Sequence, residues 1–156
     1  MPDTYTVQRS TSIAAPAQAV YSHIADFHRW NAWSPWDDLD PDLRRTYSGA
    51  DSGEGAKYAW AGNRKAGEGT MEITDATEPS RVQIALEFLK PFKSSSTTTF
   101  DLRSEGDSTS VTWTMIGPKT LMTRVMGIFK SMDKMIGPDF ERGLAQLKSV
   151  AEKGSD

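Results

Sequence analysis

Apolar and polar residues alternate along most of the chain, and the alternation gives way to a helical period in two places. From Tyr5 to Ile13 every second residue lies on one side, which is typical of a half-buried strand. Pro16 then stands where a helix begins, and apolar residues recur at helical spacing up to Ile24. A second short helix is expected from Asp26 to Trp33.

About six further strand-like segments follow at close spacing, separated by turn-forming residues. We expect them at residues 43–48, 57–61, 68–75, 81–89, 94–103 and 108–116. Connections this short between consecutive strands favour an antiparallel meander.

From Thr120 to Met135 the apolar period becomes helical again, and Gly137-Pro138 is expected to break or kink the run. A cleaner helix is then expected to start with Pro138 in its first turn and to bury a stripe from Phe140 to Ala151. Strands grouped between helical segments indicate an α+β fold. A long sheet curved over one amphipathic helix encloses a space wherever the two do not fully collapse.

Composition narrows the classes of protein that the chain can belong to. We expect a single domain over residues 1–156. There is no cysteine, which excludes disulfides, thiolate zinc sites and a cysteine nucleophile. The net charge of −3 and the scattered basic residues do not form the basic patch that nucleic-acid binding requires. No apolar run approaches the ~20 residues of a membrane span, and no signal peptide is recognised, so a cytoplasmic location is expected.

Tryptophan is concentrated in one short stretch. Three of the five tryptophans, Trp30, Trp33 and Trp36, follow the first helical segment. Clustered tryptophans mark either a corner of the core or the wall of a binding site. Both interpretations stay open from the sequence, and in the second the indole N–H groups would meet the polar end of a ligand.

The residues expected to line a ligand site share an apolar or aromatic side chain at an inward-facing position. They are Trp33, Tyr58, Trp60, Met71, Ile73, Phe88, Trp113, Met115, Met122, Met126 and Phe129. A plain core is the simpler interpretation for each one taken singly. The binding interpretation gains support because five of the seven methionines lie between residues 115 and 135, and methionine repacks readily around varied ligands. We hypothesise that the segment 120–136 gates a cavity.

Arg9 interrupts the apolar side of the first strand and is a further candidate ligand contact. If that side faces inward, the guanidinium needs a carboxylate or an anionic ligand group. Glu68, Glu72 and Glu87 are possible partners in that case. The alternative is an edge-strand arginine that reaches solvent. Tyr58 could orient a ligand through its hydroxyl group.

The sequence offers little catalytic chemistry, and the catalytic residues, if any, are unknown. His23 and His28 are five residues apart, which misses the spacing that places two metal ligands on one helical face. No metal site or cofactor is therefore expected. Gly53-Glu54-Gly55 precedes a strand, so it is interpreted as a turn rather than a phosphate loop. Glu68 and Glu72 share one strand face and could serve acid–base chemistry only if buried.

Several local segments carry a family resemblance that covers roughly residues 4–153. They are Trp33-Ser34-Pro35-Trp36 with Asp40-Pro41, Tyr58–Asn63, Gly67–Met71, Pro91-Phe92, Met132–Glu141 and Gly143-Leu144. In number and order they resemble the START-like or Bet v 1-like superfamily, and within it a bacterial polyketide cyclase/dehydrase-like subfamily. The resemblance implies a helix-grip fold, in which a curved seven-stranded antiparallel sheet, with two short helices after its first strand, wraps around a long C-terminal helix. It also implies a cavity between sheet and helix for apolar or amphipathic ligands.

These observations favour a cofactor-free protein that binds, and by extension transports or sequesters, a hydrophobic or amphipathic small molecule, as a monomer or weak homodimer. One alternative is a polyketide cyclase or dehydratase, for which Glu68, Glu72, Arg9 and His23 are the candidate acids and bases. Another is a co-chaperone-like interaction module that uses an exposed sheet face or the tryptophan cluster. The superfamily includes all three kinds of protein, and the fold does not decide among them.

Overall fold

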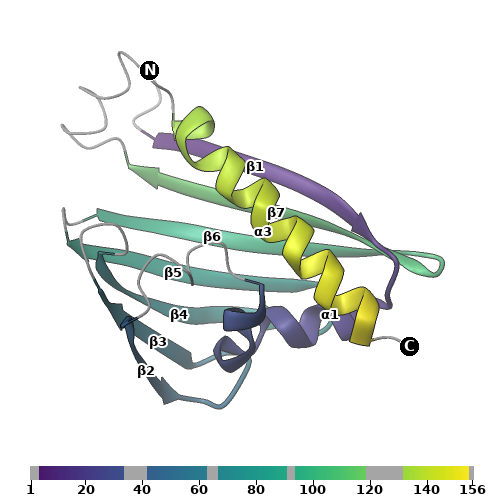
Figure 1. The fold of residues 1–156 in the computed structure, drawn as a ribbon, viewed down its shortest axis with the longest axis horizontal. Helices are drawn as coiled ribbons and strands as arrows, with labels where there is room; N and C mark the ends of the chain where they lie inside the picture. Colours follow the sequence, from purple (N-terminus) through teal and green to yellow (C-terminus); the bar gives the residue numbers. More distant parts are fainter. Residues whose placement is uncertain (1–3, 34–41, 63–66, 91–93, 119–131, 155–156) are drawn as a thin grey trace.

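The computed structural model describes residues 4–33, 42–62, 67–90, 94–118 and 132–154, and Figure 1 shows their arrangement. The elements are β1 (Thr4–Ile13), α1 (Ala17–Ile24), the 3-10 helix η1 (Phe27–Ala32), β2 (Arg44–Gly49), β3 (Ala56–Ala61), β4 (Glu68–Thr77), β5 (Arg81–Lys90), β6 (Ser94–Glu105), β7 (Ser108–Pro118) and α3 (Met132–Gly154). The α+β order expected from the sequence is confirmed, and the second short helix is a 3-10 helix.

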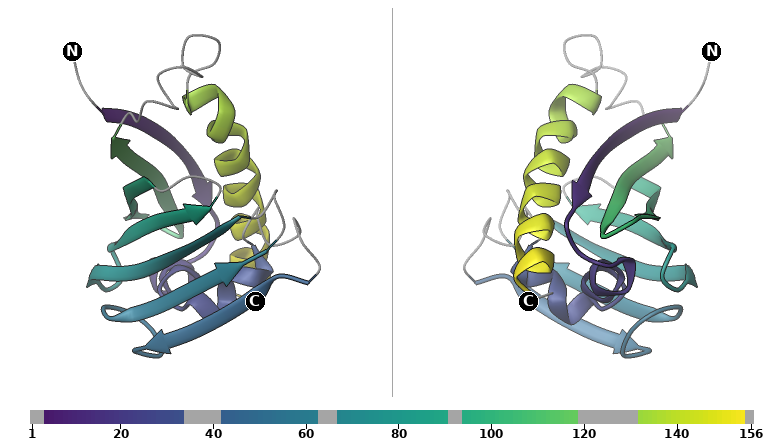
Figure 2. Two further views of the ribbon diagram at one scale, coloured as in Figure 1. Left: turned by 90° about the vertical axis from the view of Figure 1, so that its left-hand side faces the viewer. Right: turned by 90° about the vertical axis from the view of Figure 1, so that its right-hand side faces the viewer.

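The seven strands form one antiparallel sheet in the order β1-β7-β6-β5-β4-β3-β2. Strands β2 to β6 are each paired with the next strand in sequence, and β1 is paired with β7. The two edges of the sheet are therefore β1 and β2. The sheet curves, and α1, η1 and α3 lie on its concave side (Figures 1 and 2). This is the helix-grip architecture that the resemblance implies.

The C-terminal helix is longer than expected. α3 runs from Met132 to Gly154 with Pro138 inside it, so the prediction that a separate helix starts near Pro138 was wrong. Gly137 has another role, because a Cβ atom at this position would collide with the guanidinium group of Arg9 on β1. The glycine that looked like a helix breaker lies where the edge strand and the helix approach closely. Neither α3 nor any other helix in the described ranges is long and apolar enough to cross a membrane.

Polar contacts attach the C-terminal half of α3 to the end of β1. Lys148 Nζ donates to the carbonyl oxygen of Ser12 at 2.9 Å. Glu152 accepts from the backbone N–H of Ala14 at 2.8 Å and from Lys148 at 2.6 Å. The predicted buried stripe of the helix is confirmed by Phe140, Leu144, Leu147 and Ala151, each at most 2% exposed.

Aromatic rings pack closely where α3 and η1 cover the sheet. Trp113 of β7 stacks on Phe140 of α3, with ring centroids 4.1 Å apart and ring planes 7° apart. Trp33 and Phe100 meet Trp113 at 5.8 Å and 4.8 Å. We call this region the closed half. It comprises Val7, Ile13, Trp30, Trp33, Ile73, Ile84, Phe100, Trp113, Met115 and Phe140, none more than 7% exposed.

Candidate functional site

On the concave face, the strands β2, β3, β4 and β5 carry several apolar side chains that are only partly buried. They point to the same side of the sheet as the core, and Ile73 and Ile84 on β4 and β5 are fully buried. We call this region the open half. It comprises Tyr47, Tyr58, Trp60, Met71, Leu86 and Phe88.

Strand register places four of these side chains in one row across the sheet. Tyr58 of β3 is paired with Tyr47 of β2 and with Met71 of β4. Met71 is paired in turn with Leu86 of β5. Directly paired residues point to the same face with neighbouring Cβ atoms, so the row is a continuous apolar strip.

Gly69 allows the indole of Trp60 to lie across β4. Gly69 is paired with Trp60 on one side and with Phe88 on the other. A Cβ atom at residue 69 would lie 2.5 Å from Cη2 of Trp60 and 2.5 Å from the carbonyl oxygen of Glu87. Without that atom, the Trp60 ring meets Phe88 edge-on, with centroids 5.7 Å apart and planes at 86°. A glycine within a strand often marks such a close approach.

The aromatic rings continue from Trp60 to the 3-10 helix. Ring centroids are 6.1 Å apart between Trp60 and Tyr58, 5.3 Å between Tyr58 and Tyr47, and 4.2 Å between Tyr47 and His28. With Phe88, these rings form what we call the aromatic row. Its members come from β5, β3, β2 and η1, so only the folded chain brings them together.

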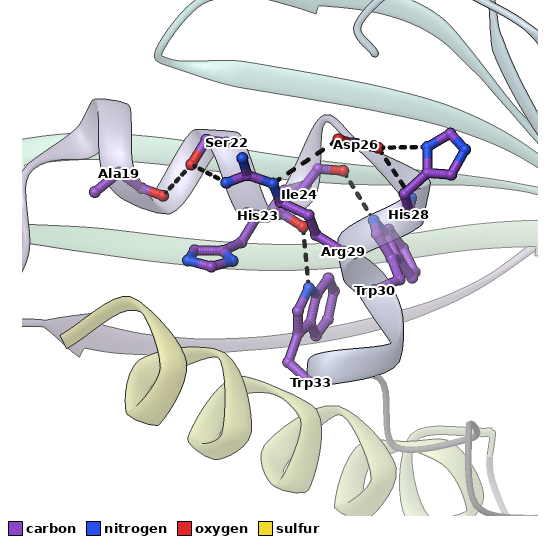
Figure 3. A network of polar contacts seen from close by, with 9 residues as sticks. All are labelled: Ala19, Ser22, His23, Ile24, Asp26, His28, Arg29, Trp30 and Trp33. Carbon is purple, nitrogen blue, oxygen red and sulfur yellow. Dashed lines mark hydrogen bonds and ion pairs between the residues drawn. The ribbon is translucent and has the colours of Figure 1, made fainter. Parts of the chain in front are cut away.

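Asp26 positions His28 at the end of the aromatic row. Asp26 Oδ1 accepts from the backbone N–H of His28 at 2.9 Å and lies 2.8 Å from His28 Nδ1 (Figure 3). Asp26 Oδ2 lies 3.8 Å from Nε of Arg29. The contact with the backbone N–H caps η1, as an aspartate before a helix commonly does.

Trp30 and Trp33 are packed as a corner of the core. Trp30 Nε1 donates to the carbonyl oxygen of Ile24 at 2.9 Å, and Trp33 Nε1 donates to that of His23 at 3.0 Å (Figure 3). Their indole N–H groups are therefore bonded within the protein. This arrangement fits the first of the two interpretations of the cluster, while Trp36 lies outside the described residues.

The structure distributes the twelve predicted site residues over four places. Tyr58, Trp60, Met71 and Phe88 come together on the open half. Trp33, Ile73, Trp113 and Met115 lie in the closed half, each at most 4% exposed. Met122, Met126 and Phe129 lie outside the described residues, as does most of the proposed gate at 120–136. Arg9 lies at the sheet edge. A contact of any of these residues with a ligand stays a prediction.

Arg9 interacts with the helix and not with the central strands. Its Nε donates to Oε2 of Glu141 on α3 at 2.8 Å. None of the possible partners Glu68, Glu72 and Glu87 pairs with it, because β7 and β6 separate β1 from the strands that carry them. The arginine is part of the attachment between β1 and α3.

Sequence reasoning missed four parts of this site. Tyr47 and Leu86 follow the same alternation as the residues that were chosen, so the period-two pattern could have found them. The role of Gly69 depends on Trp60 lying opposite it, which requires the strand register. His28 was considered only as a metal ligand.

The described part of the concave face offers contact area and hydroxyl groups rather than paired acids and bases. Its members on β3 to β6 are Ala56, Tyr58, Trp60, Gly69, Met71, Ile73, Ala76, Val82, Ile84, Leu86, Phe88, Ser96, Thr98, Phe100 and Leu102. Within the described ranges, no group of three or more His, Asp or Glu side chains is placed to hold a metal ion.

A shallow hollow of about 290 Å³ lies elsewhere, at the start of β2. It is lined by Asp42, Arg44, Ala61 and Gly62. Arg44 is paired with Ala61, one position from the pair that includes Trp60. Because side chains alternate along a strand, this hollow lies on the opposite face of the sheet from the aromatic row.

The curved seven-stranded sheet closed by a long C-terminal helix defines the START-like or Bet v 1-like class of protein. Residues 4–152 match the family model described as polyketide cyclase / dehydrase and lipid transport, and the chain belongs to this family. The expected resemblance is confirmed. A search of curated proteins finds no match.

Solved structures with the same fold share little sequence with this chain. Protein CV1439 from Chromobacterium violaceum is 16% identical, with 97% of this chain and 99% of that chain covered and a TM-score of 0.63. The Aha1 dimer from Colwellia psychrerythraea is 15% identical, with 97% of this chain and 99% of that chain covered and a TM-score of 0.66. Ara h 8.0201 is 8% identical, with 96% of this chain and 99% of that chain covered and a TM-score of 0.64. Identities this low establish the fold alone.

Proposed function

We propose that this protein binds a hydrophobic or amphipathic small molecule in a cavity between the concave face of the sheet and α3, with the open half as the floor of the cavity. The observation that carries the proposal is the partial exposure of contiguous apolar side chains on an otherwise buried face. Contiguous exposed apolar surface is a mark of binding sites. Membership in a family described by lipid transport and polyketide chemistry supports the same class of ligand.

The geometry of the open half favours flat ligands that contain rings. Tyr58 and Trp60 lie with their ring planes only 19° apart, and the ring of Phe88 lies beside Trp60 at 86° to it. Aromatic faces provide a large contact area and prefer offset-stacked or edge-on partners. Met71 lies beside them on β4 and adds a side chain that adapts its shape.

Catalysis is less well supported than binding. A cyclase or dehydratase would require acids or bases that converge on the ligand. On the described concave face of β3 to β6 the side chains are apolar or carry hydroxyl groups, and Glu72 and Glu87 are exposed on the other face. A co-chaperone-like module is also less well supported. Leu89 and Ile116, the exposed large apolar side chains of the described part, lie on strands separated by β6.

A pair of neighbouring residues on β5 provides a direct test. The uncharged fluorescent probe N-phenyl-1-naphthylamine is titrated into the wild type, Phe88→Ala and Leu89→Ala. Phe88 faces the open half, while Leu89 lies on the opposite face and is 38% exposed, so Leu89→Ala is the matched control. We expect the dissociation constant of Phe88→Ala to rise about tenfold, the equivalent of ~1.4 kcal/mol, and that of Leu89→Ala to stay unchanged.

Two observations would contradict the proposal. One is equal affinity of all three proteins for the probe, provided that circular dichroism and urea unfolding show Phe88→Ala to be folded. The other is the absence of probe binding by the wild type. Native mass spectrometry of gently purified protein would then identify any apolar molecule that is retained.

A further inference from the structure

His28 is held in one orientation by contacts on two sides. Its Nδ1 lies 2.8 Å from Asp26 Oδ1, and its ring lies nearly flat on Tyr47, with centroids 4.2 Å apart and planes 22° apart. The side chain is nevertheless 51% exposed. An exposed side chain usually loses rotamer entropy when it binds a partner. Here that freedom is already restricted before any ligand is bound.

The hydrogen bond to Asp26 determines which ring nitrogen of His28 can serve a ligand. A carboxylate only accepts hydrogen bonds, so Nδ1 carries the proton in this contact. In a neutral imidazole the other nitrogen, Nε2, is then a hydrogen-bond acceptor. Among the described residues no group bonds to Nε2, and it is the remaining polar atom of the half-exposed ring.

The ring contact is more than capping requires. A cap needs only the bond between Asp26 and the backbone N–H of His28, and residues without a ring nitrogen can provide that N–H. In addition, the Tyr47 ring on which His28 lies is 5.3 Å from Tyr58, at the centre of the aromatic row. A molecule with two or three fused rings that lies against Tyr58 can therefore extend to His28.

We propose that His28 Nε2 is the polar anchor of the site and accepts a hydrogen bond from a hydroxyl group of the bound molecule. This inference rests on the proposed function and deepens it, because it assigns the ligand a class. The ligand is a flat molecule that contains rings and carries a hydroxyl donor at one end, with its apolar body against Tyr58 and Trp60. Asp26 is a positioning residue, since it acts on the ligand through His28.

The test uses two probes of nearly the same shape. 2-Naphthol carries a hydroxyl donor, and 2-methoxynaphthalene does not. Dissociation constants for both are measured by fluorescence, at one pH, for the wild type, His28→Phe and Leu89→Ala. His28→Phe keeps the backbone N–H and an aromatic ring beside Tyr47, and it removes both ring nitrogens. Leu89→Ala changes an exposed residue on the opposite face of the sheet and serves as the control.

The expected readout is the ratio of the two dissociation constants. A net hydrogen bond contributes roughly 0.5–1.5 kcal/mol, so the preference for 2-naphthol should fall about two- to tenfold in His28→Phe. The affinity of His28→Phe for 2-methoxynaphthalene should stay unchanged, and Leu89→Ala should keep the wild-type ratio. Comparing ratios removes the difference in hydration between the probes.

The anchor and the proposed function can fail separately. An unchanged ratio in His28→Phe overturns the anchor, and so does an equal loss of affinity for both probes, which would mean an apolar contact only. In both cases the proposed function stands, because both probes still bind the wild type. Binding of neither probe to the wild type contradicts the anchor and the proposed function together.

Discussion

Trp113 and Trp60 lie on the same face of one sheet and have opposite surroundings. Trp113 is 2% exposed and stacks on Phe140 of α3. Trp60 is half-buried, and its ring lies over Gly69 and against Phe88. The same period-two alternation therefore produces core where one of the described helices covers the sheet and a candidate binding surface where none of the described helices does.

The position of α3 explains the difference between the two halves. Its polar contacts reach β1, through Lys148 and Glu152 near its end and through Glu141 near its middle. β1 is the edge of the sheet farthest from β2, so a helix attached there lies over β1, β7 and β6 (Figures 1 and 2). The open-half side chains of β2 to β5 extend beyond it, whereas Ile73 and Ile84 of the same strands are buried.

The largest expected effect is on stability, and it compares the two tryptophans directly. Trp113→Ala leaves a cavity among Trp33, Phe100 and Phe140 and should lower the free energy of unfolding by about 3–5 kcal/mol. Trp60→Ala should lower the free energy of unfolding by about 1 kcal/mol, because the wild-type ring is in contact with solvent and its removal leaves little cavity. Urea unfolding measures both. Equal losses in the two variants would break the distinction between the closed and open halves.

The next effect concerns the glycine beneath the Trp60 ring. In Gly69→Ala the new Cβ atom meets both the indole and the carbonyl oxygen of Glu87 at 2.5 Å, so the ring or the strand must shift. We expect the free energy of unfolding to fall by about 1–3 kcal/mol and the binding of N-phenyl-1-naphthylamine to weaken.

The double variant Gly69→Ala/Trp60→Leu is the control for this prediction. It removes the clash with the ring and leaves the clash with the backbone, so it should recover part of the stability and none of the binding. Thermal unfolding with probe titration measures both quantities. A Gly69→Ala protein with wild-type melting temperature and affinity would show that the indole does not depend on the glycine.

A smaller effect is expected from the attachment of α3 to β1. Glu141→Gln removes the ion pair with Arg9, in which the glutamate side chain is 61% exposed. Exposed pairs contribute about 0.2–1 kcal/mol and are screened by salt. Urea unfolding should therefore show a small loss of stability in Glu141→Gln that shrinks at high ionic strength. Probe binding on the open half should stay unchanged. A large loss of binding would mean that the two halves are coupled through α3.

The smallest effect that we expect is a dependence on pH. Partial burial, with a further contribution from the charge of Arg29, lowers the pKa of His23 below its ordinary value of 6.5. The unfolded chain then takes up the proton at a higher pH than the folded protein, so stability falls as the pH drops from 6.5 toward the folded-state pKa. Above that window His23 has no effect. The free energy of unfolding of His23→Gln, measured across the same pH range, should fall less steeply than that of the wild type. Parallel curves for the two proteins would contradict the lowered pKa of His23.

The predictable part of the candidate site is the part that depends on local pattern. Tyr58 and Trp60 are two residues apart on a strand, so they had to share a face, and Met71 and Phe88 followed from the same rule. The partner of Arg9 was not predictable, because Glu141 is distant in sequence and comes close only through the attachment of α3 to β1. Gly137 was interpreted through local helix propensity, whereas its space is occupied by Arg9.

By itself the sequence determined the strands, the α+β order, the buried stripe of α3 and the family, since each of these is recorded in short-range periodicity or local motifs. The tertiary structure alone decided which inward-facing residues became core and which stayed partly exposed. It also decided that Trp60 crosses β4 at Gly69, and that His28 joins the aromatic row. The physical reason is that period two specifies the face of a sheet but not what covers that face. Which side chains of that face are buried depends on where a helix distant in the sequence packs against the sheet.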